Sequence, residues 1–159
     1  MNRANQTTSR TRVSSIKPPR IALIATVVML MLHTMVPLAT IVPSPISYSG
    51  VAAMAVGIAM IVWSRRAFKA AGTLITPFTE SRALIRHGLY RWSRNPMYLG
   101  AVLLVGGVAV LLGSATPLLV AVGFFIILQE GFIRHEERLL SQRFGDDYLE
   151  YQRTVRRWL

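Results

Sequence analysis

Residues 97–133 read MYLGAVLLVGGVAVLLGSATPLLVAVGFFIILQEGFI, two apolar runs separated by the short residues Ser-Ala-Thr. The runs, 97–113 and 117–133, contain a single charged residue, Glu130. A helix needs about 20 apolar residues to cross the hydrocarbon core, and a thinner bilayer or snorkelling side chains accommodate a shorter one. The pattern therefore predicts a transmembrane helical hairpin, and this hairpin sets the fold class.

Two further apolar runs precede the hairpin, at residues 21–42 and 46–64, with a proline-containing turn between them. The mean hydropathy is +0.42 and 52% of the residues are hydrophobic, which is more apolar than an ordinary soluble domain. We therefore predict an all-α integral membrane protein with four transmembrane helices. The fourth apolar run continues into polar sequence, so further helices are expected after the last span.

The basic residues show how the chain is oriented. Eighteen Lys and Arg against seven Asp and Glu give a net charge of +11, and they lie in three blocks, 1–20, 65–94 and 134–159. Nucleic-acid-binding proteins spread such charge over one folded face, whereas this spacing is typical of loops between membrane spans, so we predict no nucleic-acid partner. The positive-inside rule places both termini and the connector in the cytoplasm, and we expect a multi-pass protein of a prokaryotic inner membrane.

The chain divides into three regions on this pattern. Residues 1–20 are predicted to be a disordered basic cytoplasmic arm, 21–64 two transmembrane helices, and 65–159 a connector, the hairpin and C-terminal helices. The arm can contact anionic lipid headgroups, at about 1 kcal/mol per basic residue, or act only as a topology signal. The chain has no cysteine, and we predict no metal site.

Two features within the spans have a structural interpretation. We interpret His33 as a neutral histidine bonded to a neighbouring helix, although an ionisable group inside a membrane also suggests function. Small residues in the second and third spans would allow two helices to approach closely. These residues are Gly50, Ala53, Gly57, Gly100, Gly106 and Gly107.

The connector ends in HGLYRWSRNPMYLG, residues 87–100, which is too elaborate for a simple loop. Gly88 permits a turn, and Asn95-Pro96 marks the start of the third helix, where free backbone N–H groups favour a carboxylate or phosphate. An interfacial aromatic belt with arginines reaching the headgroups explains the same residue types equally well. The connector alone therefore does not decide between a site and a membrane anchor.

The C-terminal segment favours a site. A helix that continues through residues 129–140 puts Glu130, Arg134 and Glu137 on one face. Glu136 lies on a mostly apolar stripe, so its carboxylate needs a partner, either a connector arginine or a ligand. Gly145 is expected to end this helix. The two aspartates that follow suit the start of another helix, whose tyrosines could close over the connector.

SRNPMYLG (93–100), preceded by HGLYR (87–91) and followed by HEERLLSQRFGDDYLEYQRTV (135–155), resembles the isoprenylcysteine carboxyl methyltransferase-like family of membrane methyltransferases. The resemblance covers residues 65–157 and extends more distantly to the phospholipid methyltransferases. It implies an all-helical fold whose cytoplasmic C-terminal helices enclose S-adenosylmethionine in a pocket, with an opening toward the lipid for the second substrate.

The resemblance also implies roles for individual residues. Catalytic roles fall on Arg94, Asn95 and Tyr98, with Arg94 meeting the methionine carboxylate or a substrate anion. Substrate contacts fall on Arg134, Tyr148 and Tyr151. The cofactor contacts implied are Arg82, Ala83, Leu84, Ile85, His87, Tyr90, Asn95, Pro96, Met97, Tyr98 and Glu136.

Two departures from the family bear on the substrate. Asn95 stands where the family has His, so this position can form hydrogen bonds but cannot carry a proton or a positive charge. Phe132 stands near the position where eukaryotic members place an arginine for the prenylcysteine carboxylate, and Arg134 points to another face. The resemblance therefore implies methyl transfer to a small lipophilic or lipid-like carboxylate, amine or thiol rather than to prenylcysteine.

Two alternatives remain open at this stage. One is an NADPH-dependent membrane reductase of the sterol reductase type, whose C-terminal helical fold is related but whose chain is much longer. The other is a non-catalytic module that binds anionic lipid, which would explain the arginines but not the ordered set of Tyr90, Asn95, Tyr98 and Glu136. The sequence leaves the methyl acceptor and the oligomeric state undetermined.

Overall fold

A computed structural model describes residues 18–36, 38–72 and 84–159, and within these ranges the chain is helical with no strand. The predicted all-α class is therefore confirmed. Residues 1–17, Arg82 and Ala83, for which we predicted a basic arm and cofactor contacts, lie outside the described ranges. The helices are α1 (Pro18–Met35), α2 (Ser49–Ala70), α3 (Pro96–Leu112), α4 (Ala115–Ile127), α5 (Arg134–Phe144) and α6 (Asp146–Thr154), with short turns η1 (Ile46–Tyr48), η2 (Gly88–Arg91) and the π-helical η3 (Leu128–Ile133).

Three continuous helices in the described part of the chain are long and apolar enough to cross a membrane. They are Pro18–Met35, Ile46–Ala70 and Ala115–Phe144, with 18, 25 and 30 residues. Helix α3 is equally apolar but has 17 residues. The chain is thus a membrane protein, and four spans remain a prediction.

The first apolar run was expected to be helical to residue 42, but α1 ends at Met35. A residue that precedes a proline is disfavoured in a helix, and Pro37 follows directly on the last described residue of this segment. The irregular chain beyond it bonds to the α3–α4 turn, because the amides of Ile41 and Val42 donate to the Gly113 carbonyl, at 2.8 and 2.9 Å. The end of the apolar run is therefore irregular rather than helical, and its side chains Leu38 and Ile41 stay exposed.

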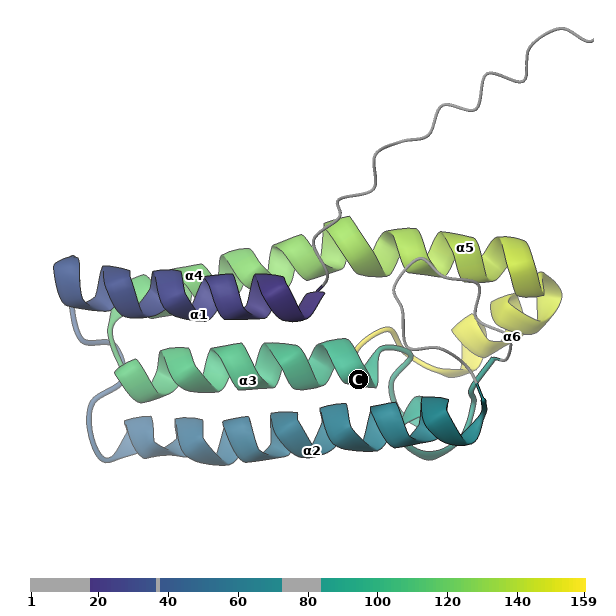
Figure 1. Cartoon of the computed structure of the whole chain (residues 1–159), viewed down its shortest axis with the longest axis horizontal. Coiled ribbons are helices and arrows are strands. Elements are labelled where there is room, and N and C mark those ends of the chain that lie inside the picture. Colours follow the sequence, from purple (N-terminus) through teal and green to yellow (C-terminus); the bar gives the residue numbers. More distant parts are fainter. Residues whose placement is uncertain (1–17, 37, 73–83) are drawn as a thin grey trace, which may run out of the picture.

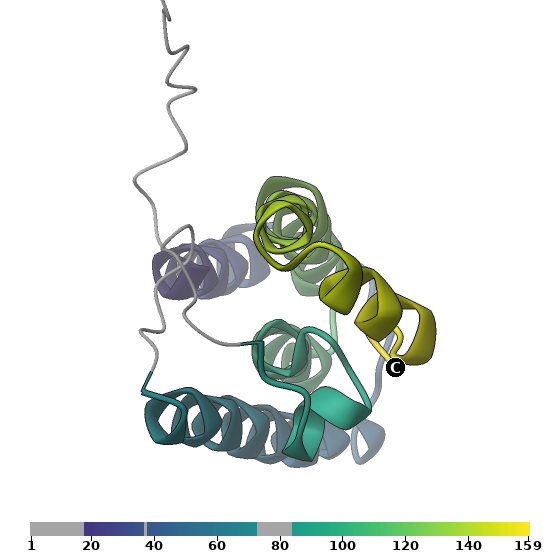
Figure 2. The same ribbon diagram turned by 90° about the vertical axis from the view of Figure 1, so that its right-hand side faces the viewer.

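Helix α3 lies between the other three long helices and packs against α1, α2 and α4 (Figures 1 and 2). The buried core forms where α1, α3, α4 and η3 meet. At the end formed by the α3–α4 turn, His33 Nδ1 lies 2.8 Å from Ser114 Oγ, the predicted bond to a neighbouring helix. The core residues are Met29, Val105, Ala109, Phe124, Leu128 and Phe132.

Helices α2 and α3 touch through their backbones at two glycine pairs, Gly50 with Gly107 and Gly57 with Gly100. A Cβ on Gly57 would lie 2.6 Å from the Gly100 carbonyl oxygen, a distance that real Cβ atoms essentially never show. The predicted close approach is therefore confirmed at these pairs. It is wrong for Gly106, where a Cβ would meet nothing within 4 Å.

Candidate functional site

The polar side chains named above gather at one end of the bundle, which we call the charged end. Here α2 ends, α3 begins, α5 projects past the other helices, and α6 folds back (Figure 1). The chain terminus returns to the start of α3 (Figure 1). Segments far apart in sequence therefore meet at this end.

Local sequence sets the directions of the backbone at this end. Gly88 has φ +62° at the start of η2, and Gly145 has φ +51° between α5 and α6, conformations that favour glycine. Pro96 occupies the first turn of α3, with Asn95 before it. The turn at Gly88, the start of α3 and the break at Gly145 thus lie where the sequence predicted them.

The hydroxyl of Tyr98 donates a hydrogen bond to Glu136 Oε2 at 2.9 Å. Tyr98 lies in the first turn of α3 and Glu136 in the first turn of α5, 38 residues further along the chain. Both side chains are only partly exposed. The sequence had offered a connector arginine or a ligand as the partner of this carboxylate, and in the structure the partner is Tyr98.

The connector arginine instead pairs with the next glutamate. Glu137 is 6% exposed, and its Oε1 lies 3.4 Å from Arg94 Nη1. Its two oxygens also accept from Arg157, with Nη2 to Oε2 at 2.7 Å and Nε at 3.1 Å from each. The prediction that Glu137 pairs with Arg134 is wrong, because Glu137 pairs with Arg94 and Arg157, and Arg134 pairs with Glu130 at 2.7 Å.

Arg94 is strongly buried, and Glu137 satisfies only part of it. Its side chain is 10% exposed, and the contact with Glu137 is an ion pair without hydrogen-bond geometry. Its Nε and Nη1 atoms are buried and find no hydrogen-bond partner among the residues that the structure describes. Buried donors are normally satisfied, so Arg94 retains donors that an anionic ligand can use.

Aromatic residues border this cluster. Tyr151 donates to the Tyr90 carbonyl at 2.6 Å, and the Tyr90 ring packs edge-on against Phe68 with centroids 5.7 Å apart. Tyr148 lies beside Tyr151, with centroids 6.1 Å apart, and is 2% exposed. Helix α6 therefore closes onto the connector through its two tyrosines, as predicted.

Burial controls the ionisation of these groups. It raises the pKa of Tyr148 to about 12, the nearby Glu137 carboxylate adds to the rise, and Arg94 opposes it. Burial likewise raises the pKa of Tyr151 and of Tyr90, against an opposing contribution from the Ser64 hydroxyl at Tyr90. Hydrogen bonds to Glu137 raise the pKa of Arg157 in spite of desolvation. The tyrosines thus remain neutral near neutral pH.

The last residues of the chain join this site, and the sequence interpretation missed them. The Arg94 amide donates to the Arg156 carbonyl, and the side chains of Ser93 and Asn95 donate to the Arg157 carbonyl. The indole Nε1 of Trp158 donates to Gln129 Oε1 at 2.9 Å. A tryptophan beside two arginines at a polar terminus was the available signal. This segment shows no helical period, so the sequence alone gives it no predicted role.

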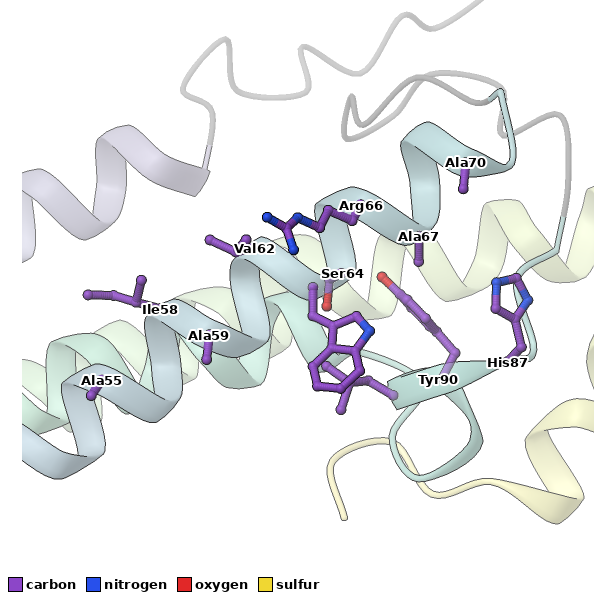
Figure 3. Close-up of a pocket in the computed structure, with 13 residues that line it drawn as sticks. Ala55, Ile58, Ala59, Val62, Ser64, Arg66, Ala67, Ala70, His87 and Tyr90 are labelled. Carbon is purple, nitrogen blue, oxygen red and sulfur yellow. The ribbon is translucent and has the colours of Figure 1, made fainter.

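A groove of about 680 Å³ lies on the connector side of α2, between this helix and η2 (Figure 3). Its walls are mostly alanine and aliphatic side chains, and Arg66 and His87 are among its polar lining residues. Figure 3 shows Tyr90 pointing from η2 toward α2, beside Ser64 and Ala67. The groove gives an apolar chain a surface close to the buried tyrosines.

The other residues predicted to contact the cofactor or substrate differ in burial and position. Ile85 and Pro96 are buried, and Leu84 and Met97 are half-buried, near the start of α3. His87 is exposed, and Arg134 lies on the outer face with Glu130. The described residues include no group of His, Asp and Glu that could hold a metal ion.

Residues 46–147 match the phospholipid methyltransferase family, and the chain belongs to this family. It is 36% identical over 81 residues to protein-S-isoprenylcysteine O-methyltransferase A of Arabidopsis thaliana, covering 49% of this chain and 40% of that protein. The enzyme of the same type from Saccharomyces cerevisiae is 36% identical over 79 residues, covering 48% and 32%.

An uncharacterized protein of Haemophilus influenzae is 35% identical over 63 residues, which cover 40% of this chain and all of that protein. The matched part spans less than half the length of the two named methyltransferases. No solved structure matches the chain. The predicted membership of a membrane methyltransferase family is thus confirmed by sequence comparison.

Proposed function

We propose that the protein is an S-adenosylmethionine-dependent methyltransferase embedded in the membrane, acting on a small lipophilic substrate. The observation that carries this proposal is the hydrogen bond between Tyr98 and Glu136, at 2.9 Å. It joins two segments that lie within the family match, at the end of the bundle where the buried arginine also lies. An aromatic membrane anchor has no need of such a pair.

The charged end offers groups that suit this cofactor. Arg94 has buried N–H groups to which no described residue hydrogen-bonds, and such groups suit the methionine carboxylate. The carboxylate of Glu136 can accept from ribose hydroxyls or from an amino group, and Tyr98 orients it. When bound, the cofactor supplies an electrophilic methyl group on a sulfonium. These residues hold and orient their ligand and exclude water.

The acceptor is inferred from what the site lacks. Methyl transfer to a carboxylate requires alignment and exclusion of water rather than a base, and the described residues at the charged end include no buried histidine. Phe132 is 4% exposed and belongs to the apolar core, so its position provides no cation for a prenylcysteine carboxylate. We therefore propose a small lipophilic acid as the first acceptor to test, followed by amines and thiols.

We also propose four spans, with the charged end in the cytoplasm. The charged end contains basic residues, such as Arg65 near the end of α2 and Arg91 in η2. The opposite turns, around Pro43 and Ser114, have no charged residue. This asymmetry favours a cytoplasmic site under the positive-inside rule.

Calorimetric titration of the detergent-purified protein tests the proposal. S-adenosylmethionine and S-adenosylhomocysteine are expected to bind and NADPH is not. Tyr98→Phe removes a hydrogen bond to a charged group, so it should weaken binding by about tenfold or more.

Tyr48→Phe is the matched control, because Tyr48 is 63% exposed and lies at the opposite end of α2. Binding of NADPH alone would move the protein to the reductase class. If none of the three ligands binds, a lipid-binding membrane module becomes the better account. Equal affinity in Tyr98→Phe and Tyr48→Phe would remove Tyr98 from the site.

A further inference from the structure

We propose that residues 156–158 form a C-terminal clasp that positions the start of α3 against α5 and so shapes the cofactor site. This inference rests on the proposed function for its effect on ligand affinity, but not for its structural basis. The clasp lies outside the segment that matches the family, which ends at residue 147.

The backbone of the clasp holds the residues that precede α3. The Arg94 amide donates to the Arg156 carbonyl at 3.0 Å. The Arg157 carbonyl accepts from Ser93 Oγ at 3.3 Å and from Asn95 Nδ2 at 3.2 Å. Ser93 is 1% exposed and Asn95 9%, so these bonds form away from solvent. Removal of the acceptors would leave buried donors unsatisfied.

The side chains of the clasp contact the long helix that lies across the site from the start of α3. The Arg157 guanidinium bonds to both oxygens of Glu137 on α5. The Trp158 indole donates to Gln129 in η3 and packs against Phe125 of α4, with ring centroids 5.0 Å apart. The same three residues therefore contact both the start of α3 and the long helix that contains Glu136.

These anchor points flank the proposed cofactor contacts. Tyr98 lies in the turn that follows Asn95, and Glu136 directly precedes Glu137. The main packing partners of α5 are η3 and α6 rather than α3. Its distance from α3 therefore depends on side-chain bridges, which include Tyr98–Glu136, Arg94–Glu137 and the bonds of the clasp. A displaced clasp would let the two contacts drift apart.

The clasp gives Asn95 a role that differs from a direct ligand contact. Its amide N–H₂ is committed to the Arg157 carbonyl. A position with this task needs a donor and no charge, which both an amide and a neutral imidazole provide. Asn95 is on this account a positioning residue, and Asp at the same place, of equal size but without a donor, should release the clasp.

The experiment uses Trp158 as its probe. The chain has three tryptophans, and Trp63 and Trp92 are 63% and 76% exposed, so both can be changed to Phe. Acrylamide quenching of the remaining Trp158 then reports the docking of the clasp, and calorimetry with S-adenosylhomocysteine reports ligand affinity. Asn95→Asp and Arg157→Ala should each increase quenching and weaken binding by about tenfold. Saturating ligand should reduce quenching again, because the coupling between ligand binding and docking of the clasp is reciprocal.

Asn95→His keeps a donor and should retain low quenching, and Arg153→Ala, on the exposed face of α6, is the surface control. If Asn95→Asp does not fold, Gln129→Met removes the indole acceptor more mildly and should release Trp158. Unchanged quenching in Asn95→Asp, Arg157→Ala and Gln129→Met would overturn the clasp, as would its release without loss of affinity. If the parent protein binds no S-adenosylhomocysteine, the proposed function fails, while release of Trp158 by Asn95→Asp still supports the structural tie.

Discussion

Two regions of the molecule hold α3 in place by opposite means. Along its length, the glycine seam (Gly50, Gly57, Gly100 and Gly107) brings α3 into backbone contact with α2 without any charged group. At its start, the charged junction (Arg94, Glu137 and Arg157) ties the chain before α3 to α5 and to the chain terminus through buried ion pairs. The glycine seam depends on close packing, and the charged junction depends on ion pairs between its side chains.

The two means differ in what they require of the sequence. A glycine seam gains dispersion contacts and needs only that side chains be absent. A buried ion pair must recover the desolvation of every member, and replacing such a group by apolar residues is often neutral or stabilising. Stability alone therefore does not explain the charged junction, whereas the proposed site for an ionic ligand would.

The largest effect is expected at the centre of the charged junction. Glu137→Ala leaves Arg94 buried and without its counter-ion, so it should destabilise the protein by roughly 3–5 kcal/mol. Thermal unfolding in detergent measures the loss. Glu130→Ala removes a glutamate from the same helix whose partner is half-exposed, and it should cost about 1 kcal/mol or less. Equal losses of stability in Glu137→Ala and Glu130→Ala would show that the buried ion pair contributes no more than the exposed one.

The glycine seam comes next. Gly57→Ala places a methyl group 2.6 Å from the Gly100 carbonyl oxygen, so the helices must separate, at a cost of roughly 1–3 kcal/mol. Gly106→Ala is the matched control in α3, because it meets open space and should gain up to about 1 kcal/mol from helix propensity. The same unfolding assay compares them. A loss in Gly106→Ala as large as that in Gly57→Ala would show that helix contact does not decide the effect.

The sequence predicted the glycine seam better than the charged junction. Small residues at helical spacing indicate close approach without knowledge of the partner, and two of the three glycines expected on α3 do make it. A charge indicates only that a partner is needed. The partners of Glu137 lie 43 residues before it and 20 residues after it, and these separations follow from the tertiary fold.

The π-helical turn η3 explains part of the difference. The expected faces of the last long helix assumed 3.6 residues per turn throughout, but residues Leu128–Ile133 form i→i+5 bonds. This turn shifts the phase of α5 relative to α4. Glu137 therefore turns inward, while Glu130 and Arg134 remain on the outer face. The apolar periodicity of the run gave no sign of the extra residue.

Resemblance, rather than periodicity, predicts that Tyr98 and Glu136 belong to one site. Local chemistry predicted the start of α3 at Asn95-Pro96 and the break at Gly145, because proline fixes φ and glycine tolerates a positive φ. The C-terminal clasp shows no helical period and lies beyond the motifs that carry the resemblance, which end at residue 155. Irregular segments that pack through backbone carbonyls leave little trace in a sequence, because any residue supplies a carbonyl.

The smallest effect is expected at an exposed ion pair of the charged end. This pair tests whether burial, rather than charge alone, makes the charged junction important for stability. Arg86 lies 3.5 Å from an Asp147 carboxylate oxygen and 4.0 Å from Glu150, but its side chain is 39% exposed and theirs are 76% and 74% exposed. Water already solvates all three, so Arg86→Gln should cost less than about 1 kcal/mol. The difference should disappear in high salt, since exposed charges are screened there.

The salt dependence makes this prediction discriminating. Parent and Arg86→Gln proteins are compared by thermal unfolding at low and at molar salt, with Glu137→Ala measured alongside. The loss in Glu137→Ala should persist in high salt, because a buried pair is screened much less. A large, salt-resistant loss in Arg86→Gln would place Arg86 with the buried groups, through its contacts with the Asp147 carbonyl and the Tyr151 ring, and would extend the charged junction onto α6.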